Sequence, residues 1–513
     1  MKIQVLIVLL GLFGLVYTPI YMSATRQFRE YIGPRFVVSW VICISSAFVV
    51  PTTALWLLVI FVTFLATVRT RLDAACRFML LAALLPNVLT RVIISDAYLV
   101  DLTTMLVLCS ALFIADVALR DPHRVPRLSK MTAEDALVIV LFLIFWIGAT
   151  RFPSITLFLR LGLKQFVVFA LPYIVLRRSI RNAAELKIAL GAVGVSGAIL
   201  GFYAIYEVAN GWAVFDAISA RFDQGEHMSK NLLMRGSSMR ASVTMSPLPL
   251  ASYLAFAIVA LGYCRALIKS KLMHRLGLGV AILGFLGTQS RGNTILVALA
   301  LIAHFAARRK WGTATGLVVS SAVGFGLLLL VARVSPGLAS FLHVGQQAEV
   351  RFGGVYDYRQ LLLQRGLEEA ATHRWIGASM PTVLENLADI TQGQGIVDLV
   401  NSYLTIYLIS GLLGFTLFAS LFLAILGRLW RKLPKGSAGE VVTGRLAAIG
   451  LIVTLLGQLS FMSLVDRVPL MLMFALVAAR LILLERQRFG REVRMRQEAL
   501  RTPSLSAPLS PTV

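Results

Sequence analysis

The chain has 513 residues, of which 58% are hydrophobic and only 14% are charged, and its mean hydropathy is +0.80. A soluble protein carries about 25% charged residues, so this composition excludes an ordinary soluble fold and indicates a helical membrane protein. The net charge of +24 suggests a nucleic-acid partner at first. The basic residues lie in short connectors between apolar runs, however, and we therefore predict no nucleic-acid binding.

Apolar runs recur from end to end and predict an all-α, polytopic integral membrane protein with roughly 13 to 15 transmembrane helices. The count has a range because Pro51 either separates two elements or kinks one. We interpret the first run as a retained helix, with a cleavable signal peptide as the alternative. In chain order, the expected spans are 3–20, 36–50, 52–69, 77–90, 98–118, 134–150, 155–176, 185–207, 246–266, 276–289, 292–307, 313–333, 397–427, 443–464 and 467–484.

The charge pattern predicts how the chain sits in the membrane. Nearly half of the 49 Lys and Arg residues, but few acids, fall in six short connectors, at 68–77, 119–130, 177–187, 265–275, 308–310 and 428–445. In the two longest polar segments, 208–245 and 334–396, acids slightly outnumber basic residues. The positive-inside rule therefore predicts cytoplasmic connectors, a cytoplasmic C-terminus and two long outer loops in a multi-pass protein of the plasma membrane. The side of the N-terminus stays open.

The helices are predicted to form a single transmembrane domain over 1–484. Its two outer loops, of which 334–396 is expected to be partly helical, are long enough to be functional. The remainder, 485–513, carries six arginines between Arg486 and Arg501 and ends in a Pro- and Ser-rich stretch. We expect it to be a basic and then disordered cytoplasmic tail.

The cysteines and histidines give no sign of metal or disulfide chemistry. Cys43, Cys76, Cys109 and Cys264 lie in apolar or cytoplasmic segments without CxxC spacing. The six histidines include no pair at metal-ligand spacing. We therefore expect no disulfide, no metal site and no cofactor.

The stretch TQSRGN places Arg291 between two apolar runs. Because Arg275 and Arg308 are predicted to lie on the same side, the chain between them must cross outward and return. Each limb has roughly 16 residues, about 24 Å long, whereas the hydrocarbon core is about 30 Å thick. The turn should therefore stop inside the membrane, where an arginine is tolerated only beside water or an anion. The alternative is an arginine that snorkels to the outer headgroups.

The chemistry of Arg291 suits a phosphate ligand. A guanidinium presents a planar fork of donors that matches phosphate oxygens bidentately. The sequence contains no GxxxxGK[ST] loop, and the predicted site faces away from cytoplasmic nucleotides. We therefore expect the phosphate to belong to a lipid.

Four stretches together resemble the O-antigen ligase and O-antigen polymerase superfamily, and they occur in the order typical of that family. They are RASVTMSPLPLASYLAF at 240–256, TQSRGNTILVALAL around Arg291, YRQLLLQRGLEEAATHRWIGAS at 358–379 and NSYLTIYLISGLLGFTLF at 401–418. The resemblance covers about 240–430. It departs from the family at Val400, where ligases typically have a histidine, at the missing glycine after Arg240, and at GAS, where Gly-x-Gly is common. The missing histidine favours the polymerase branch.

The resemblance implies a metal-independent glycosyltransferase of the bacterial cytoplasmic (inner) membrane. It would use undecaprenyl-diphosphate-linked oligosaccharides at the outer, periplasmic face, where the two long loops would lie. A hydroxyl of a second lipid-linked repeat unit would attack the anomeric carbon, and the lipid diphosphate would leave. Expected partners are the lipid-linked oligosaccharide, membrane lipids, and flippase and chain-length regulator proteins.

Catalytic candidates follow from the charges in this reaction. Fixed cations stabilise a departing diphosphate, and we assign this role to Arg291, Arg240 and Arg359. Arg240 is alternatively an ordinary loop charge, and Arg359 alternatively pairs with a nearby acid. Asp398 is the candidate for the base that takes the acceptor's proton, with a charge at a helix N-terminus as the alternative.

Four further residues are candidates for substrate binding. Asn401 and Tyr403 are expected to orient sugar or phosphate, although helix packing accounts equally well for Tyr403. Arg365 and His373 are weaker candidates from the outer-loop helix, and an exposed surface position explains either of them.

Three other functions remain open. A ligase would use the same donor but transfer the glycan to a lipid A core or another acceptor. A lipid-linked oligosaccharide flippase or transporter typically has charges within many helices and short outer loops, unlike this chain. The last alternative is a structural membrane component.

Overall fold

The protein is helical almost throughout. The computed structural model describes residues 2–94, 97–119, 131–148, 150–151, 154–222, 234–235, 238–316, 318–319, 355–390, 397, 399–431, 433, 438–464 and 467–501. Its α-helices are α1 (Lys2–Ser23), α2 (Arg26–Ile32), α3 (Pro34–Val49), α4 (Thr53–Thr67), α5 (Arg71–Leu84), α6 (Thr104–Ala118), α7 (Ala133–Leu143), α8 (Ile155–Gln165), α9 (Leu171–Ser179), α10 (Ala183–Asn210), α11 (Asp216–Arg221), α13 (Pro247–Tyr263), α14 (Lys271–Gly287), α15 (Arg291–Ala307), α18 (Val355–Thr372), α19 (Met380–Asn386), α20 (Ser402–Trp430), α21 (Gly439–Gln458) and α22 (Val468–Arg501). Single turns of π-helix are η1 (Ile144–Gly148) and η2 (Phe166–Ala170), and η3 (Arg265–Leu267) is a 3₁₀ turn. The strands form two antiparallel pairs, β1 (Leu89–Ile94) with β2 (Ala97–Thr103) and β3 (Met234–Arg235) with β4 (Ser238–Met239).

The predicted class, an all-α polytopic membrane protein, is confirmed. Within the described residues, seven helices of at least 18 residues are long and apolar enough to cross a membrane. These are Ile3–Ser23, Arg26–Val49, Ile155–Ser179, Ala183–Asn210, Ser402–Trp430, Gly439–Gln458 and Val468–Met495. Shorter apolar helices occur at Thr53–Thr67, Thr104–Ala118, Pro247–Tyr263 and Gly292–Ala307.

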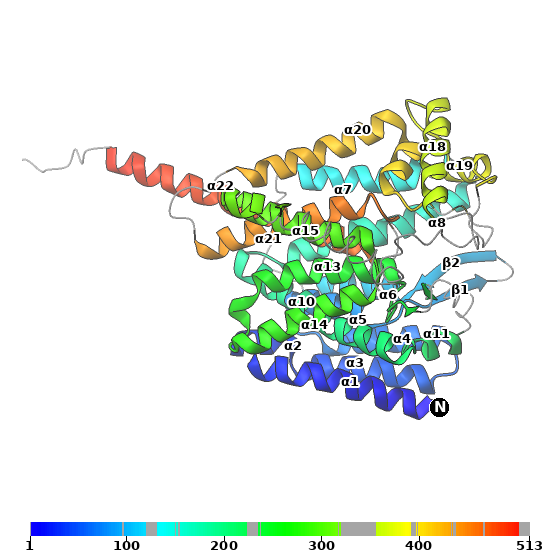
Figure 1. The fold of residues 1–513 in the computed structure, drawn as a ribbon, viewed down its shortest axis with the longest axis horizontal. Helices are drawn as coiled ribbons and strands as arrows, with labels where there is room; N and C mark the ends of the chain where they lie inside the picture. Colours follow the sequence, from blue (N-terminus) through cyan, green and yellow to red (C-terminus); the bar gives the residue numbers. More distant parts are fainter. Residues whose placement is uncertain are drawn as a thin grey trace, which may run out of the picture.

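The long helices run roughly alongside one another in layers (Figure 1). In Figure 1, α1 and α3 form the lower edge, α10 and α13 lie centrally, and α20, α7 and α18 lie at the upper edge. The central helix α10 carries a stripe of small residues that lets its neighbours approach closely. A Cβ at Gly197 would lie 2.2 Å from Ala257 on α13, and one at Gly201 would lie 2.6 Å from the carbonyl oxygen of Val280 on α14.

Basic connectors from distant parts of the sequence meet at one end of the bundle. Asp116, at the end of α6, pairs with Arg71 at 3.0 Å and with Arg178 at 3.1 Å. Lys187 of α10 reaches Glu440 of α21 at 3.5 Å. This gathering is what the positive-inside pattern predicts for loops on one face of a membrane.

The opposite end carries β1, β2, α11, α18 and α19, and the N-terminal end of α1 lies there too (Figure 1). The far end of α1 is tied to a basic connector, since Thr25 N donates to Leu267 O at 2.9 Å and Lys269 N donates to Ser23 O at 2.7 Å. The structure therefore places the start of α1 at the same end of the bundle as the long polar loops, a point that the sequence did not decide.

The prediction of a helix beginning at 98 is wrong. Residues 97–103 form β2, which pairs with β1, and the helix begins only at Thr104. The two strands are rich in Val, Ile, Leu and Thr, which favour extended structure. Thr103 caps α6 by accepting from Leu106 N at 3.1 Å, and the Thr104 hydroxyl bonds to Pro86 O at 2.9 Å. An apolar run alone did not distinguish this hairpin from a span.

The tail also differs from its predicted boundary at 484. Helix α22 has 34 residues and continues to Arg501, so the basic segment is helical. The Pro- and Ser-rich end, most of the predicted span 313–333 and the outer-loop segment before α18 lie outside the described residues.

Candidate functional site

The turn between α14 and α15 is buried inside the protein. Both helices have 17 residues, which confirms the predicted short hairpin. Thr288, Ser290 and Asn293 have at most 7% of their surface exposed, and Gln289 adopts a left-handed φ of 52°. Asn293 Nδ2 donates to Ser290 Oγ at 2.9 Å. The turn is therefore a polar, strained segment enclosed by apolar helices.

The segment around Arg240 lies directly against this turn. Arg240 Nε donates to Thr288 O at 3.0 Å, and Ala241 N donates to Gly287 O at 3.1 Å. The Arg240 side chain is half-buried. Two of the stretches that carry the family resemblance are therefore in contact, although they are about 50 residues apart in the sequence.

A buried carboxylate in α10 fixes the chain just after Arg240. Glu207 is fully buried, and its Oε2 accepts from Ser242 N and from Val243 N, both at 2.9 Å. Its Oε1 accepts from Val214 N at 2.9 Å. Val243 has a left-handed φ of 48°, which is costly for a β-branched residue. Three charge-assisted hydrogen bonds hold the backbone in this conformation.

A buried arginine lies at the same end of the bundle. Arg467 is 0% exposed, and its Nε donates to Ala82 O at 2.9 Å at the end of α5. The next carbonyl, Ala83 O, accepts from the Thr244 hydroxyl at 2.6 Å. The end of α5 therefore binds both Arg467 and the segment that follows Arg240.

Helix α20 begins beside the segment that follows α21, which also contacts α13. Ser402 N donates to Leu459 O at 2.8 Å, and the Ser402 hydroxyl donates to Met462 O. Ser252 of α13 donates to Met462 Sδ at 2.8 Å and lies 3.4 Å from Asn293 Oδ1. The NSYL stretch is thereby joined to the buried turn through the segment after α21.

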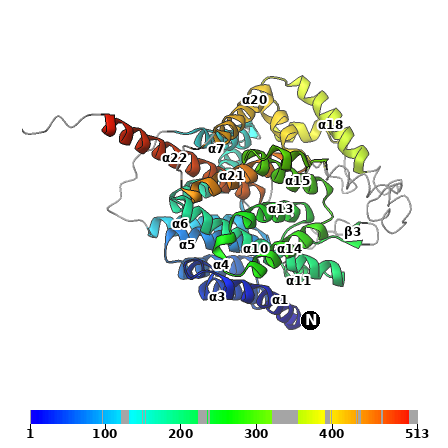
Figure 2. The ribbon, with the colours of Figure 1, turned by 60° about the vertical axis from the view of Figure 1, so that its left-hand side comes forward.

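Helix α18, in the second long polar loop, is joined to α20 by close glycine contacts. Gly377 and Gly411 both have left-handed φ angles, of 74° and 62°. A Cβ at Gly411 would lie 2.3 Å from the backbone of Trp375, and Ala378 N donates to Leu408 O at 2.7 Å. The kink in α20 at Gly411 therefore receives the turn that follows α18. Figure 2 shows α18 beside the end of α20.

The predicted cations separate into two groups. Arg240 contacts the turn that leads into Arg291, the first residue of α15, whose side chain lies outside the described part of the structure. Arg359, Arg365 and His373 are exposed on or just after α18. These three side chains lie on the surface of the protein and do not contact the buried turn.

Arg365 is engaged by acids of its own loop. It pairs with Asp389 at 2.8 Å and with Glu368 at 3.1 Å. The hydrogen bond to Asp389, followed by that to Glu368, raises the pKa of Arg365 above its ordinary value. Arg365 is therefore an exposed residue whose ion pairs join α18 to the segment after α19, and its predicted role in substrate binding stays a prediction.

Asn401 and Tyr403 make structural contacts. Asn401 is the N-cap of α20, and its Oδ1 accepts from Tyr403 N at 3.0 Å and from Leu404 N at 3.2 Å. The Tyr403 hydroxyl donates to Leu456 O at 2.6 Å, which agrees with helix packing. Asp398 lies outside the described residues.

Glu207 and Arg467 were not among the predicted site residues. Glu207 is a single charge within an apolar run, and Arg467 follows Asp466 at the edge of another, and such charges are costly unless they serve a structure or a function. Arg291 was chosen because a charged residue between apolar segments is costly, and the same reasoning applies to Glu207 and Arg467.

The described part of the chain contains no group of three or more His, Cys, Asp or Glu side chains placed to hold a metal ion. All four cysteines are free and buried. Comparison of the sequence with protein-family models and with curated proteins found no match.

The geometry combines a cation with several hydroxyl, amide and backbone groups at one end of an apolar bundle. Two of the buried polar atoms, Ser242 Oγ and Gln458 Oε1, have no hydrogen-bond partner among the described residues. Unpaired buried polar atoms are rare and costly, at about 1–3 kcal/mol each. These unpaired atoms lie beside the contacts that join the segment of Arg240 to the buried turn, which makes this end of the bundle the candidate site.

Proposed function

We propose that the protein is a glycosyltransferase that polymerises undecaprenyl-diphosphate-linked oligosaccharide repeat units at the outer face of the bacterial cytoplasmic membrane. The product class is an exopolysaccharide, a capsule or an O-antigen. The proposal needs neither a metal nor a nucleotide sugar, since the donor's glycosyl–diphosphate bond supplies the energy.

One observation carries the proposal, namely that the four stretches of the family resemblance form a continuous chain of contacts. Arg240 binds the turn before Arg291, and Asn293 of that turn lies against Ser252, which contacts the segment beside Ser402. Gly366 of α18 completes the chain, because a Cβ there would lie 2.8 Å from Leu404. Stretches spread over about 170 residues of sequence therefore converge at the end of the bundle that carries the long loops.

The proposed reaction assigns roles to this convergence. The acceptor hydroxyl oxygen forms a bond to the anomeric carbon, and the bond from that carbon to the diphosphate oxygen breaks. Arg291 and Arg240 stabilise the charge on the departing diphosphate, and Asp398 takes the hydroxyl proton. Glu207 and Arg467 are positioning residues, because they hold the backbone that carries Arg240.

A ligase that transfers the glycan to a lipid A core or another acceptor is the second candidate. The residue before NSYL distinguishes the ligase from the polymerase, because ligases typically have a histidine there. In this protein the position is Val400, which is buried in an apolar cluster with Leu399 and Leu404. An apolar side chain cannot transfer a proton, and this favours the polymerase.

Deleting the gene and sizing the lipid-linked glycans tests the proposal. Loss of long polymer with accumulation of single repeat units is the expected result. Long chains that lack their final attachment would instead indicate a ligase. Repeat units trapped on the inner leaflet would indicate a flippase, and an unchanged glycan profile would leave the structural alternative.

A further inference from the structure

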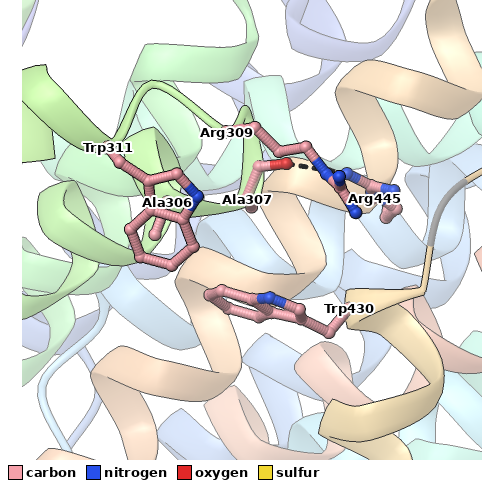
Figure 3. Close-up of a pocket in the computed structure, with 6 residues that line it drawn as sticks. All are labelled: Ala306, Ala307, Arg309, Trp311, Trp430 and Arg445. Atoms are coloured by element: carbon pink, nitrogen blue, oxygen red, sulfur yellow. Dashed lines mark hydrogen bonds between the residues drawn. The ribbon is translucent and has the colours of Figure 1, made fainter.

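A cavity of about 230 Å³ lies at the basic end of the bundle, opposite the proposed catalytic face. It opens between the C-terminal ends of α15 and α20 and the beginning of α21, and it is shown in Figure 3. Its lining residues are Ala306, Ala307, Arg309, Trp311, Trp430 and Arg445. One water needs only about 10–15 Å³ of such volume, so the cavity has room for a group of several heavy atoms.

Arg445 forms the fixed wall of this cavity. Its Nη2 donates to Ala307 O and its Nη1 to Arg431 O, both at 3.1 Å, so it joins the last turns of α15 and α20. Its Nε is buried and has no hydrogen-bond partner among the described residues. A residue that lines the cavity therefore carries a donor that still lacks an acceptor.

Arg309 adds a second cation to the same cavity. The guanidinium groups of Arg309 and Arg445 point toward one another (Figure 3). Two like charges in a partly desolvated place repel each other unless an anion lies between them. The nearby acids are engaged elsewhere, since Glu440 pairs with Lys187 and Glu485 accepts from Ala183 N at 2.8 Å.

Two indole rings complete the lining. Trp311 is 59% exposed and Trp430 is 39% exposed, although both are large aromatic side chains. Partly exposed tryptophans beside arginines at the ends of apolar helices are typical of the headgroup region of a membrane. The cavity therefore lies at the depth where lipid phosphates are found.

We propose that this cavity binds the phosphate of an anionic membrane phospholipid on the side of the basic connectors. Arg309 and Arg445 bind the phosphate oxygens, and Trp311 and Trp430 pack against the glycerol and upper acyl region. Basic pockets between transmembrane helices on the cytoplasmic side have this ligand class. The site is separate from the proposed glycosyl transfer, which takes place at the other end of the bundle.

Thermal unfolding of the purified full-length protein in detergent tests the proposal. The protein is titrated with phosphatidylglycerol, with phosphatidylcholine or with inorganic phosphate, and Tm is recorded. The test variant is Arg309→Gln, which removes one cation without removing the two hydrogen bonds of Arg445. The control is Arg491→Gln, which makes the same charge change on the exposed part of α22.

We expect phosphatidylglycerol, but not phosphatidylcholine, to raise Tm of the wild type and of Arg491→Gln. Arg309→Gln should need about ten times more phosphatidylglycerol for the same rise. Trp311→Ala keeps both cations and should need about three times more, which provides a second test if Arg309→Gln does not fold.

Three results would overturn the proposal. If Arg309→Gln and Arg491→Gln both weakened the rise of Tm with phosphatidylglycerol by the same factor, only general surface charge would attract the lipid. An equal rise of Tm with inorganic phosphate would mean that the cavity binds a free anion. An equal response to phosphatidylcholine would remove the requirement for an anionic headgroup.

Discussion

At the scale of single residues, the candidate site depends on charges that are satisfied by backbone groups. Glu207 accepts three backbone N–H groups, and Arg467 donates to carbonyls at the end of α5. Backbone partners fix a charge in position without adding a second charged side chain to the apolar interior. Both residues therefore determine where the segment of Arg240 lies.

Replacing Glu207 by Gln should disturb this segment. An amide has one acceptor oxygen and presents its NH₂ group to at least one of the three N–H donors, which leaves buried donors unpaired. We expect a loss of about 1–3 kcal/mol in the free energy of unfolding and a corresponding drop in Tm. Glu385→Gln, on an exposed position of α19, is the matched control and should leave Tm unchanged. An unaltered Tm in Glu207→Gln would contradict the role given to the carboxylate.

Arg291 is the residue for which the proposed function makes the sharpest prediction. Arg291→Lys keeps the charge but loses the planar fork of donors. We therefore expect both Arg291→Lys and Arg291→Ala to impair polymer formation. The expected cost is about 2–4 kcal/mol, or roughly 30- to 1000-fold in rate. Polymer length and accumulation of single repeat units are compared at matched membrane levels. Full activity of Arg291→Lys would favour the snorkelling alternative, and full activity of Arg291→Ala would remove the residue from the site.

At the scale of secondary-structure elements, hydrophobic periodicity and length predicted the helices well and the strands poorly. The hairpin α14–α15 followed from the number of residues between Arg275 and Arg308, because helix rise is fixed. The hairpin β1–β2 was missed because its apolar residues continue into α6, and only pairing between strands distinguishes the two. The kink of α20 was not predicted either, since a glycine inside an apolar run is common in membrane helices.

The kink at Gly411 gives a prediction for this element. A methyl group at Gly411 would meet the backbone of Trp375, and the φ of 62° is itself unfavourable for alanine. Gly411→Ala should therefore destabilise the protein, by several kcal/mol in the combined effect of overpacking and backbone strain. Gly427→Ala, in the same helix with nothing within 4 Å of its Cβ, should be neutral or slightly stabilising. Equal Tm values in the two variants would show that the contact between α18 and α20 is not tight.

At the scale of the whole molecule, the sequence predicted which connectors gather at one end of the bundle better than it predicted the contacts within the candidate site at the other end. The side of each connector follows from arginine and lysine counts, which are local. The site depends on contacts between residues far apart in the sequence, such as Arg240 with Thr288, and spacing does not reveal them. The stretches chosen by the family resemblance do contact one another, and Asn401 and Tyr403 make the contacts of a helix cap and of helix packing, while their proposed roles toward substrate stay predictions.

The arrangement predicts which sites face outward. The four native cysteines are buried, so single added cysteines report their own exposure. In cells with a permeabilised outer membrane, an impermeant maleimide should label Gln4→Cys and Glu385→Cys but not Lys269→Cys. All three residues are exposed in the fold, which makes Lys269 a matched control for accessibility. Labelling of Lys269→Cys together with protection of Glu385→Cys would invert the orientation.

The proposed function also predicts the requirements of the whole reaction. Because arginines stabilise the departing diphosphate, the purified protein should elongate lipid-linked repeat units in EDTA and without added nucleotide. Polymer formation from defined lipid-linked units is measured with and without the chelator. Loss of activity in EDTA that magnesium or manganese restores would contradict the proposal.

Helix α22 is longer than the hydrocarbon core of a membrane is thick. Its 34 residues are about 51 Å long, whereas the hydrocarbon core is about 30 Å thick. Arg467, the residue directly before α22, binds the end of α5, so roughly 20 Å of the helix projects beyond the opposite end of the bundle, as Figure 1 shows. The helix is continuous along its length, and its other end lies beside the segment that follows Arg240. One continuous helix therefore runs from the candidate site to a point well beyond the opposite end of the bundle, so the position of its projecting part is fixed by the packing at the site.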